Sequence, residues 1–249
     1  MVILKSKAEI EKMRIAARWA MEILLYLKDF VKEGIRTIEL ETLCEEKIRK
    51  IGNVRPAFKG YNDFPYCLCV SINDEVVHGM PSERVLRDGD IVSLDFGTLY
   101  DGYYGDAAMT YGVGTISKAA EKLLKVTENA LYRGIEEAKD GNRLYDISHA
   151  VQTCVEEAGF SVVRDFVGHG IGRGLHEEPQ LPNYGEKGTG TRLKPGMTLA
   201  IEPMVNMGGS EVYIKPNRWT AVTKDGSLSA HFEHTIAITD LGPEILSVV

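Results

Sequence analysis

The segment SLDFGTLYDGYYGDAAMT, residues 93–110, decides the fold because it predicts an antiparallel β-hairpin. The dipeptide Asp101-Gly102 near its centre is a strong signal for a two-residue turn. Apolar and aromatic runs on both sides predict strands over residues 91–97 and 103–111. A hairpin of this kind indicates a sheet that is antiparallel.

This hairpin brings two carboxylates to one place. If Asp101-Gly102 forms the turn, Asp106 faces Gly97 and Asp95 is its diagonal neighbour. Diagonal neighbours share a face of the sheet, with Cα atoms roughly 7–8 Å apart. Two buried like charges are costly unless something positive lies between them. At this point a capped turn or an arginine partner is an equal alternative to a functional pair.

The chain also repeats itself at an offset of 107 residues. The matching positions are Gly34 and Gly141, Arg36 and Arg143, Gly52 and Gly159, Gly89 and Gly196, and Asp95 and Glu202. Without a low-complexity linker between them, the two parts predict one domain over residues 1–249. We expect duplicated halves at about 6–111 and 115–240, related by a pseudo-twofold axis.

Hydrophobic periodicity gives both halves the same order of elements. Apolar residues at every third or fourth position predict helices over 6–33, 37–51, 117–139 and 145–158. Shorter apolar runs predict strands over 66–73, 91–97 and 103–111, then 162–168, 197–201, 221–224 and 231–239. The pattern predicts an α+β fold with helices covering one face of a curved antiparallel sheet.

Carboxylates recur in the second half. Glu202 corresponds to Asp95, and the following Pro203 holds it in extended backbone. Strand alternation places Glu233 on the same face as His231. A buried glutamate at such a position needs compensation for its charge.

His169 lies between two glycines at the end of a predicted strand. A lone histidine is more often structural than a ligand, but flanking glycines permit close approach of the backbone to a bound group. Four carboxylates and one imidazole suit Mn, Fe(II), Co or Zn in a two-metal centre. Two divalent cations would neutralise four carboxylates, which explains how these acids can be buried.

The composition narrows the class of protein. The chain has 249 residues, 44% of them hydrophobic, and 29 basic against 36 acidic residues give a net charge of −7. This charge argues against nucleic-acid or membrane binding through bulk charge. We find neither a signal peptide nor an apolar run of the roughly 18 residues that span a membrane. Cys44, Cys67, Cys69 and Cys154 are expected to be free thiols in a cytoplasmic protein.

Six motifs resemble those of the type I methionine aminopeptidases, a family with the creatinase-like pita-bread fold. They are VVHGMP (76–81), SLDFG (93–97), GDAAMT (105–110), GHGIGRGLHEEP (168–179), AIEPM (200–204) and HFEHT (231–235). Together they are highly specific and extend over most of the chain after residue 65. The resemblance implies five metal ligands: Asp95, Asp106, His169, Glu202 and Glu233.

The resemblance also implies roles for residues that do not bind metal. His176 is expected to polarise the scissile carbonyl and stabilise the tetrahedral intermediate, and His78 to hydrogen-bond the substrate backbone. Among the metal ligands, we expect Glu202 also to carry the proton of the nucleophile to the leaving amine, because a carboxylate beside the metal is within general-base reach. The implied methionine pocket comprises Tyr61, Phe64, Cys69, Leu175 and Trp219. Phe58 and Leu175 stand where familiar bacterial members often carry cysteine and phenylalanine.

The implied activity is removal of the N-terminal methionine from nascent polypeptides with a small second residue, by hydrolysis assisted by two divalent metal ions. The family likeness implies a monomer that meets its substrates at or near the ribosome. A proline-directed relative, aminopeptidase P or prolidase, is the alternative enzyme, although those enzymes usually carry a large additional N-terminal domain. A metal-free member that binds RNA or protein is the alternative outside enzymes, and it would lack bound metal.

Overall fold

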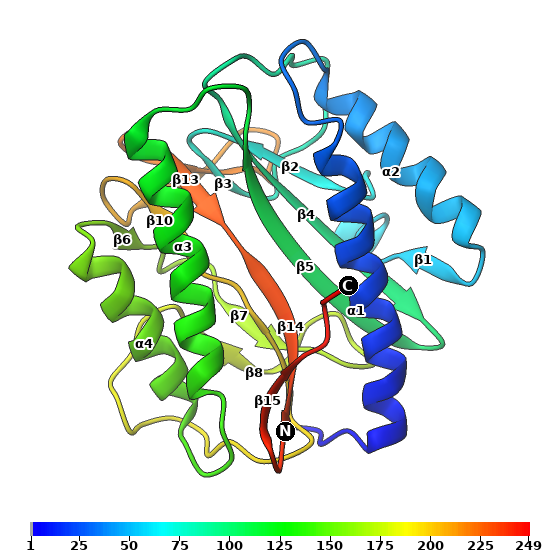
Figure 1. Cartoon of the computed structure of the whole chain (residues 1–249), viewed down its shortest axis with the longest axis vertical. Helices are drawn as coiled ribbons and strands as arrows, with labels where there is room; N and C mark the ends of the chain where they lie inside the picture. The colour runs from blue at the N-terminus through cyan, green and yellow to red at the C-terminus, as the bar shows by residue number, and fades with distance from the viewer. Residues whose placement is uncertain (1) are drawn as a thin grey trace.

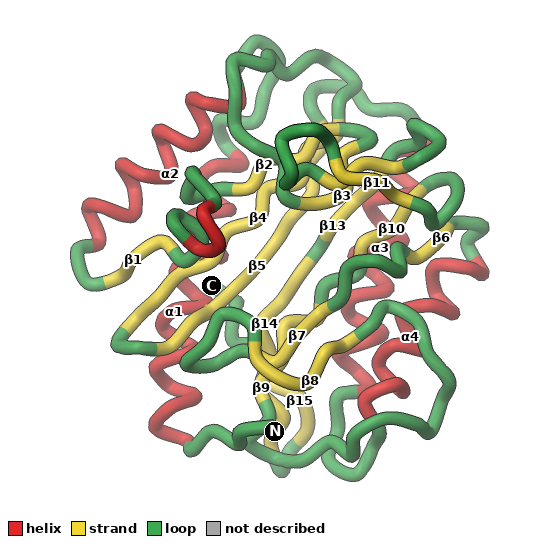
Figure 2. The backbone as a smooth tube through the Cα atoms, turned by 180° about the vertical axis from the view of Figure 1, so that it is seen from behind, coloured by secondary structure: helices red, strands yellow, loops and turns green. Residues whose placement is uncertain are grey.

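Four α-helices lie on one face of a curved antiparallel sheet in the computed structural model, which describes residues 2–249 (Figure 1). The helices are α1 (Lys7–Lys28), α2 (Thr37–Ile51), α3 (Lys118–Glu137) and α4 (Leu144–Glu157). Seen from behind, the sheet stands in front of the helices and loops border its other face (Figure 2). One face of the sheet is therefore covered by helices, and the other is framed by loops.

The central sheet has nine strands and joins segments that are far apart in the sequence. Its main order is β1 (Val54–Pro56), β4 (Ile91–Tyr100), β5 (Tyr103–Gly112), β14 (Glu233–Thr239), β9 (Thr198–Ile201), β7 (Gly168–Gly170) and β8 (Glu177–Leu181). The remaining two are β2 (Cys69–Ile72), which pairs with β4, and β15 (Gly242–Ile245), which pairs with β14. Strand β14 thus lies between the hairpin of the first half and β9 of the second.

Two three-stranded sheets and a 3₁₀ turn complete the described elements. One small sheet has the order β13 (Ser229–His231), β10 (Met204–Asn206) and β6 (Ser161–Val162). The other has the order β11 (Val212–Ile214), β12 (Ala221–Thr223) and β3 (Glu75–Val77). The 3₁₀ turn is η1 (Tyr61–Asp63). In Figure 2, β3 and β11 lie at the upper end of the open face, and β6 and β10 lie toward its right side.

The register of the predicted hairpin is confirmed, although β4 continues beyond the predicted end at Gly97 to Tyr100. Tyr100 pairs with Tyr103, and Gly97 pairs with Asp106. Asp101 and Gly102 both have positive φ, at 45° and 79°, as a two-residue hairpin turn requires. Thus the dipeptide fixes which residues of β4 and β5 share the open face.

Helix α1 begins where the sequence predicts and ends earlier. Ser6 caps its start, and the Glu9 carboxylate accepts a hydrogen bond from the Ser6 amide. The prediction that this helix reaches residue 33 is wrong, because α1 ends at Lys28. Phe30 donates to the Leu27 carbonyl in a tighter turn, yet it still packs on the core beneath α1. The apolar pattern therefore continues after the helical backbone has stopped.

Three predicted strands also differ in extent. The strand expected over 66–73 is shorter, and the one expected over 231–239 is interrupted at Phe232, between β13 and β14. The run predicted over 162–168 forms no single strand, because the chain leaves one small sheet at Val162 and enters the central sheet at Gly168. The crossing between them is irregular and borders the cavity described below.

The hydrophobic core has a large cluster under each pair of helices. One packs α1 and α2 on the first hairpin through residues such as Leu24 and Phe96, and the other packs α3 and α4 on the later strands through residues such as Leu131 and Ile236. Every helix within residues 2–249 is too short or too polar to cross a bilayer. The core thus packs the helices on one face of the sheet and leaves the other face available for a functional site.

Candidate active site

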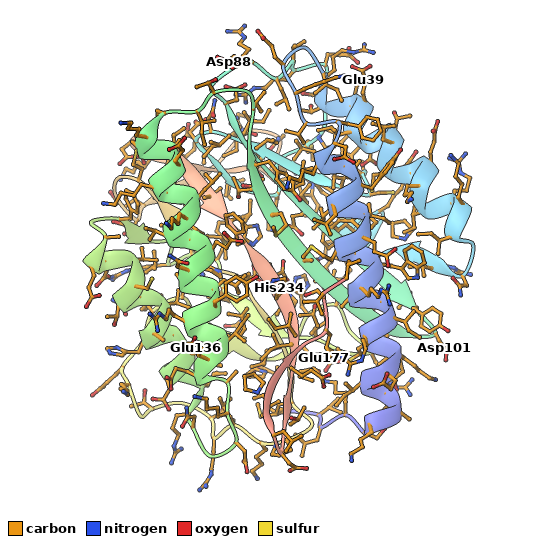
Figure 3. All side chains as sticks on the ribbon, in the orientation of Figure 1. Glu39, Asp88, Asp101, Glu136, Glu177 and His234 are labelled. Carbon is orange, nitrogen blue, oxygen red and sulfur yellow. The ribbon has the colours of Figure 1, made fainter. Side chains whose placement is uncertain are left out.

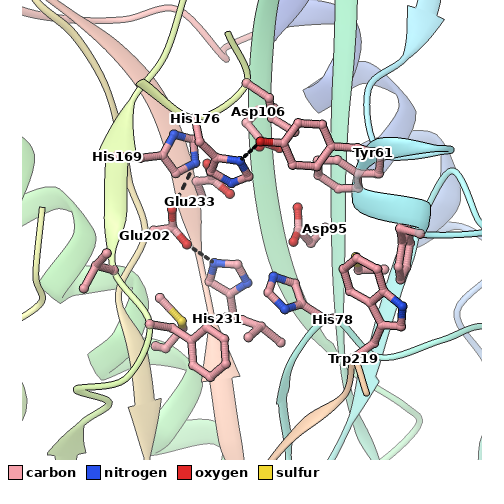
Figure 4. A pocket seen from close by; sticks show the side chains of 18 of the residues that line it. Tyr61, His78, Asp95, Asp106, His169, His176, Glu202, Trp219, His231 and Glu233 are labelled. Carbon is pink, nitrogen blue, oxygen red and sulfur yellow. Dashed lines mark hydrogen bonds and ion pairs between the residues drawn. The ribbon is translucent and has the colours of Figure 1, made fainter. Parts of the chain in front are cut away.

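A cavity of ≈ 270 Å³ lies on the open face of the central sheet. All twelve residues selected from the sequence line it, as Figure 4 shows for most of them. They are Tyr61, Phe64, Cys69, His78, Asp95, Asp106, His169, Leu175, His176, Glu202, Trp219 and Glu233. The structure thus brings together side chains from the whole predicted set.

Three adjacent strands place a row of carboxylates along one wall. Asp95 pairs across β4 and β5 with Ala108, and Ala108 pairs across β5 and β14 with Glu233. Directly paired residues share a face, so the small Ala108 leaves room between the two acids. Asp106 lies two residues from Ala108 along β5 and points to the same side.

The backbone around Asp106 is locked by β14. The Thr235 hydroxyl accepts a hydrogen bond from the Asp106 amide at 2.9 Å and donates one to its carbonyl at 2.7 Å. On the partner strand, a Cβ added at Gly97 would lie 2.7 Å from Phe58. Only glycine therefore fits opposite Asp106 while Phe58 borders the cavity.

His169 is oriented by its own strand. A Cβ at Gly168 would lie 2.5 Å from the Ala200 carbonyl oxygen, and one at Gly170 would lie 2.3 Å from that of Glu178. The glycines therefore permit the close strand packing that holds the imidazole. Its Nδ1 lies 2.9 Å from the Gly170 carbonyl, which can only accept, so Nδ1 carries the proton and Nε2 is an acceptor facing the cavity.

Glu202 lies opposite the aspartates, next to two imidazoles. Its carboxylate is 3.4 Å from His169 Nε2 and 3.8 Å from His231 Nε2 (Figure 4). The Asn183 side chain donates to the Glu202 carbonyl at 3.1 Å and fixes its backbone.

Burial sets the protonation of the four acids. Desolvation raises the pKa of Asp106 to about 7, against a lowering contribution from the Ala107 amide. Desolvation, with added repulsion from neighbouring carboxylates, raises the pKa of Asp95, Glu202 and Glu233 well above the ordinary value. Among the described residues that line the cavity, none is lysine or arginine. The alternative of an arginine partner is therefore wrong.

The imidazoles do not provide the missing positive charge. Desolvation lowers the pKa of His169 to about 3 and that of His78 to about 4, with His176 adding repulsion in both cases. Desolvation also lowers the pKa of His231 to about 3 and reduces the pKa of His176. These rings are neutral at pH 7, so the cluster contains four acids and only neutral donors.

Several buried polar atoms point to what the cluster binds. Within residues 2–249, Asp95 Oδ1, Glu233 Oε1 and His231 Nε2 are buried without a hydrogen-bond partner. Donor atoms of Asp106, His169 and Glu233 lie within 4.8 Å of one another, and so do those of Glu202, His231 and Glu233. Oxygen donors with imidazole nitrogen are the ligands that first-row divalent metals bind. The residues present therefore fit divalent metal ions.

Two further histidines border the cluster. His176 Nδ1 lies 2.8 Å from the Tyr61 hydroxyl, and its ring centre is 4.3 Å from that of His169. His78 has φ of 57°, an uncommon conformation for a residue other than glycine. It is followed by Gly79, where a Cβ would lie 2.1 Å from the Val70 carbonyl oxygen. The backbone at this point is shaped to present His78 to the cavity.

The other side of the cavity is apolar. Phe64 and Trp219 pack edge to face with centroids 5.1 Å apart, and Cys69 and Leu175 are buried beside them. Phe166 stacks on the edge of His78 with centroids 5.5 Å apart. This wall suits an apolar side chain better than a polar or charged one.

Some residues that line the cavity were not predicted from the sequence. His231 shares the face of Glu233, as alternation predicts, but it was given no role. Phe166 and Met204 also line the cavity, and the first lies in the stretch wrongly predicted as a continuous strand. His234 points to the opposite, helix-covered side, where it bonds Ser247 at 2.8 Å (Figure 3). Strand alternation could have separated His231 from His234, but it could not assign a ligand.

Comparisons with known proteins agree with this geometry. Residues 11–240 match the model of metallopeptidase family M24. Methionine aminopeptidase 1 of Bacillus subtilis (strain 168) is 54% identical over 249 residues, which is 100% of both chains. The crystal structure of the Thermotoga maritima methionine aminopeptidase superposes with a TM-score of 0.98, at 50% identity and 100% coverage of both chains.

A proline-directed relative is more distant. The Xaa-Pro dipeptidase of Bacillus anthracis is 25% identical with a TM-score of 0.78, and the match covers 99% of this chain and 62% of that one. The pita-bread fold expected from the motifs is confirmed by these neighbours. The chain therefore belongs to metallopeptidase family M24, within the group that includes the bacterial methionine aminopeptidases.

Proposed function

We propose that this metallopeptidase removes the N-terminal methionine from peptides and proteins whose second residue is small. One observation carries the proposal: four buried carboxylates and the free Nε2 of one histidine surround a cavity that has an apolar wall. Two divalent ions would be held by Asp95, Asp106, His169, Glu202 and Glu233. Mn, Fe(II), Co and Zn all suit this donor set.

The metal ions and the protein side chains would have different roles in the hydrolysis. When bound, the ions supply a water of lowered pKa as nucleophile and polarise the scissile carbonyl. Glu202 would take the proton from the attacking water and deliver it to the leaving amine, since a carboxylate beside the bound ions would be within general-base reach of that water. Its backbone bond from Asn183 holds it at the edge of the cluster during this transfer.

His176 would stabilise the charge that develops on the carbonyl oxygen. If the Tyr61 hydroxyl donates to Nδ1, then Nε2 carries a proton and can donate into the cavity. A neutral, partly desolvated imidazole with fixed orientation is an effective donor to such an oxyanion. His78, held at positive φ, would hydrogen-bond the substrate backbone from the other side.

The apolar wall would bind the methionine side chain. Sulfur beside aromatic rings is favourable, and Phe64, Trp219 and Tyr61 provide such rings. Phe58 and Leu175 shape this pocket, and both line the cavity. The α-amine must reach the acidic cluster, so the second side chain would lie at the rim, where only a small residue fits.

The protein's partners follow from this substrate. Nascent polypeptides, met at or near the ribosome, are the proposed substrates, and we propose a cytoplasmic monomer without direct binding of nucleic acid. The net charge of −7 supports the last point.

The test measures metal and activity together. Exhaustively chelated protein should not cleave Met-Ala-Ser, and activity should return when Mn, Fe(II), Co or Zn is added singly, saturating near two ions per chain. Full activity of protein shown to contain zero metal would contradict the dinuclear proposal. A Gly-Pro dipeptide cleaved in preference to Met-Ala-Ser would favour the proline-directed alternative, and a purified protein that binds no metal would favour the non-enzymatic one.

A further inference from the structure

A buried ion pair ties the segment before α1 to the loop that carries His176. Lys5 Nζ lies 2.5 Å from Glu177 Oε2, and the two residues are 172 positions apart in the sequence. Their side chains are only 4% and 13% exposed. The pair is thus unlike the solvent-exposed ion pairs that contribute little.

The same carboxylate also holds the loop backbone. Glu177 Oε1 accepts a hydrogen bond from the Gly174 amide at 2.9 Å, while Oε2 binds Lys5. Within the loop, the Gly172 amide donates to the Gly174 carbonyl at 3.1 Å. One side chain therefore links the lysine to the turn formed by residues 172–174.

Lys5 also fills a space made for it. A Cβ at Gly172 would lie 2.3 Å from Lys5 Cε and 2.8 Å from its Nζ. The Lys5 amide donates to the Gly196 carbonyl at 2.7 Å, which fixes the backbone against the turn before β9. The lysine thus packs directly under the loop and is held there at both ends.

The loop carries two residues of the cavity. Leu175 and His176 follow the turn immediately, and both line the cavity. His176 is joined to this turn through the backbone and to Tyr61 through its side chain, and its ring centre lies 4.3 Å from that of His169. Any shift of the 172–174 turn therefore moves the imidazole relative to the acidic cluster.

We propose that Lys5 is a positioning residue, which acts through Glu177 to place His176 over the acidic cluster. The proposal rests on the role of His176 given under Proposed function. Removal of the lysine leaves the Glu177 carboxylate buried without its cation, a costly state that the loop can relieve by moving toward water. Displacement of a catalytic group by about 1 Å can cost on the order of 10²-fold in rate.

The first measurement compares two lysine substitutions in the metal-loaded protein. Lys5→Met should lower kcat on Met-Ala-Ser by about 10-fold to 10²-fold with metal content unchanged. Lys7→Met is the matched control, because Lys7 is two residues away and exposed. It should stay within about twofold of wild type. Equal kcat for wild type and a folded Lys5→Met variant would overturn the proposal.

The second measurement separates positioning from general stability. In a His176→Ala background, Lys5→Met should reduce kcat no further, because the group that it positions is gone. If the two effects multiply, Lys5 does not act through His176 and the proposal fails. If His176→Ala alone leaves kcat unchanged, the role assigned to His176 under Proposed function fails first, and this inference fails with it.

A third measurement needs no activity. In metal-free protein, hydrogen exchange at the Gly174 amide should accelerate in Lys5→Met and not in Lys7→Met.

Glu177→Gln serves as a second variant if Lys5→Met does not fold, since it keeps an acceptor for the Gly174 amide and loses the charge that binds Lys5. It should also lower kcat without an added effect in the His176→Ala background. Unchanged exchange in Lys5→Met, or unchanged kcat in Glu177→Gln, would count against the proposal.

Discussion

Replacement of Asp106 by asparagine should stabilise the metal-free protein, and more so at higher pH. Desolvation raises the pKa of Asp106 from 3.8 to about 7 on folding. The folded state therefore binds this proton more tightly than the unfolded chain, and the free energy of unfolding falls as pH rises from about 4 through about 7. Above that window the penalty reaches roughly 4 kcal/mol, at about 1.4 kcal/mol per pH unit.

Asparagine has the same shape and no charge to bury, so it removes this penalty. The gain in unfolding free energy of Asp106→Asn over wild type should grow from roughly 1–2 kcal/mol at pH 5 to about 4 kcal/mol at pH 8. The difference between the two proteins is the quantity to follow, because the buried neutral histidines titrate in both and cancel. Their own effect has the opposite sign: stability is lost as pH falls below their unfolded pKa. Asparagine also removes the repulsion of Asp106 on Asp95, Glu202 and Glu233, which adds to the gain wherever those acids are ionised.

The assay is urea unfolding of chelated protein at several pH values, followed by the same titration with metal. Added metal should stabilise wild type by RT ln(1 + [L]/Kd), about 2.7 kcal/mol at a hundredfold excess over Kd. It should stabilise Asp106→Asn far less. A variant no more stable than wild type at pH 8, or a gain independent of pH, would refute the electrostatic account of the buried cluster.

Other predictions concern turnover. Glu202→Gln should lose kcat by orders of magnitude, because it removes a ligand charge and the proton carrier together, and a near wild-type rate would exclude that role. His176→Ala and His78→Ala should each lose about 10²-fold to 10⁴-fold in kcat and keep two metal ions per chain, as metal analysis will check. Met-Ala-Ser should be cleaved with much higher kcat/KM than Met-Lys-Ser, Met-Phe-Ser or Leu-Ala-Ser, and efficient cleavage of acetyl-Met-Ala-Ser would contradict a free amine bound at the cluster.

The hairpin and the shared face of Asp95 and Asp106 could be predicted because their signals are local, whereas Glu202 was predicted from the repeat at an offset of 107 residues. Asp101-Gly102 permits one turn geometry, and that geometry fixes the register of Asp95 and Asp106. Alternation then places Glu233 and His231 on one face. These rules concern a few neighbouring residues, so they hold whatever surrounds them.

Other features depend on contacts that no local pattern encodes. The short strands β3, β10 and β11 have three residues each, too few to show a period. The crossing between β6 and β7, residues 163–167, contains valines and a phenylalanine that are typical of a strand, but it must pass from one sheet to another. The pairing of Lys5 with Glu177 joins residues that are 172 positions apart in the sequence, and neither segment has a local pattern that predicts it.

The duplication of the domain stays a prediction, with some support from the pairing of loops. Arg36 bridges Val85, and Arg143 bridges Arg192, at the same offset of 107 residues as the sequence repeat. Both arginines precede a helix whose third residue is an acid that bonds back to the arginine amide. A common ancestor for the halves would explain why both helices begin in the same way.

The central place of β14 has a consequence for biosynthesis. This strand is synthesised after every other strand of the central sheet except β15, yet it pairs with β5 on one side and β9 on the other. Until it leaves the ribosome, both neighbours present unpaired edges, which are templates for aggregation. A chain that stops before residue 233 would therefore lack the central strand of its sheet. Such incomplete products should be inactive and prone to aggregation, and chaperones and proteases should act on them.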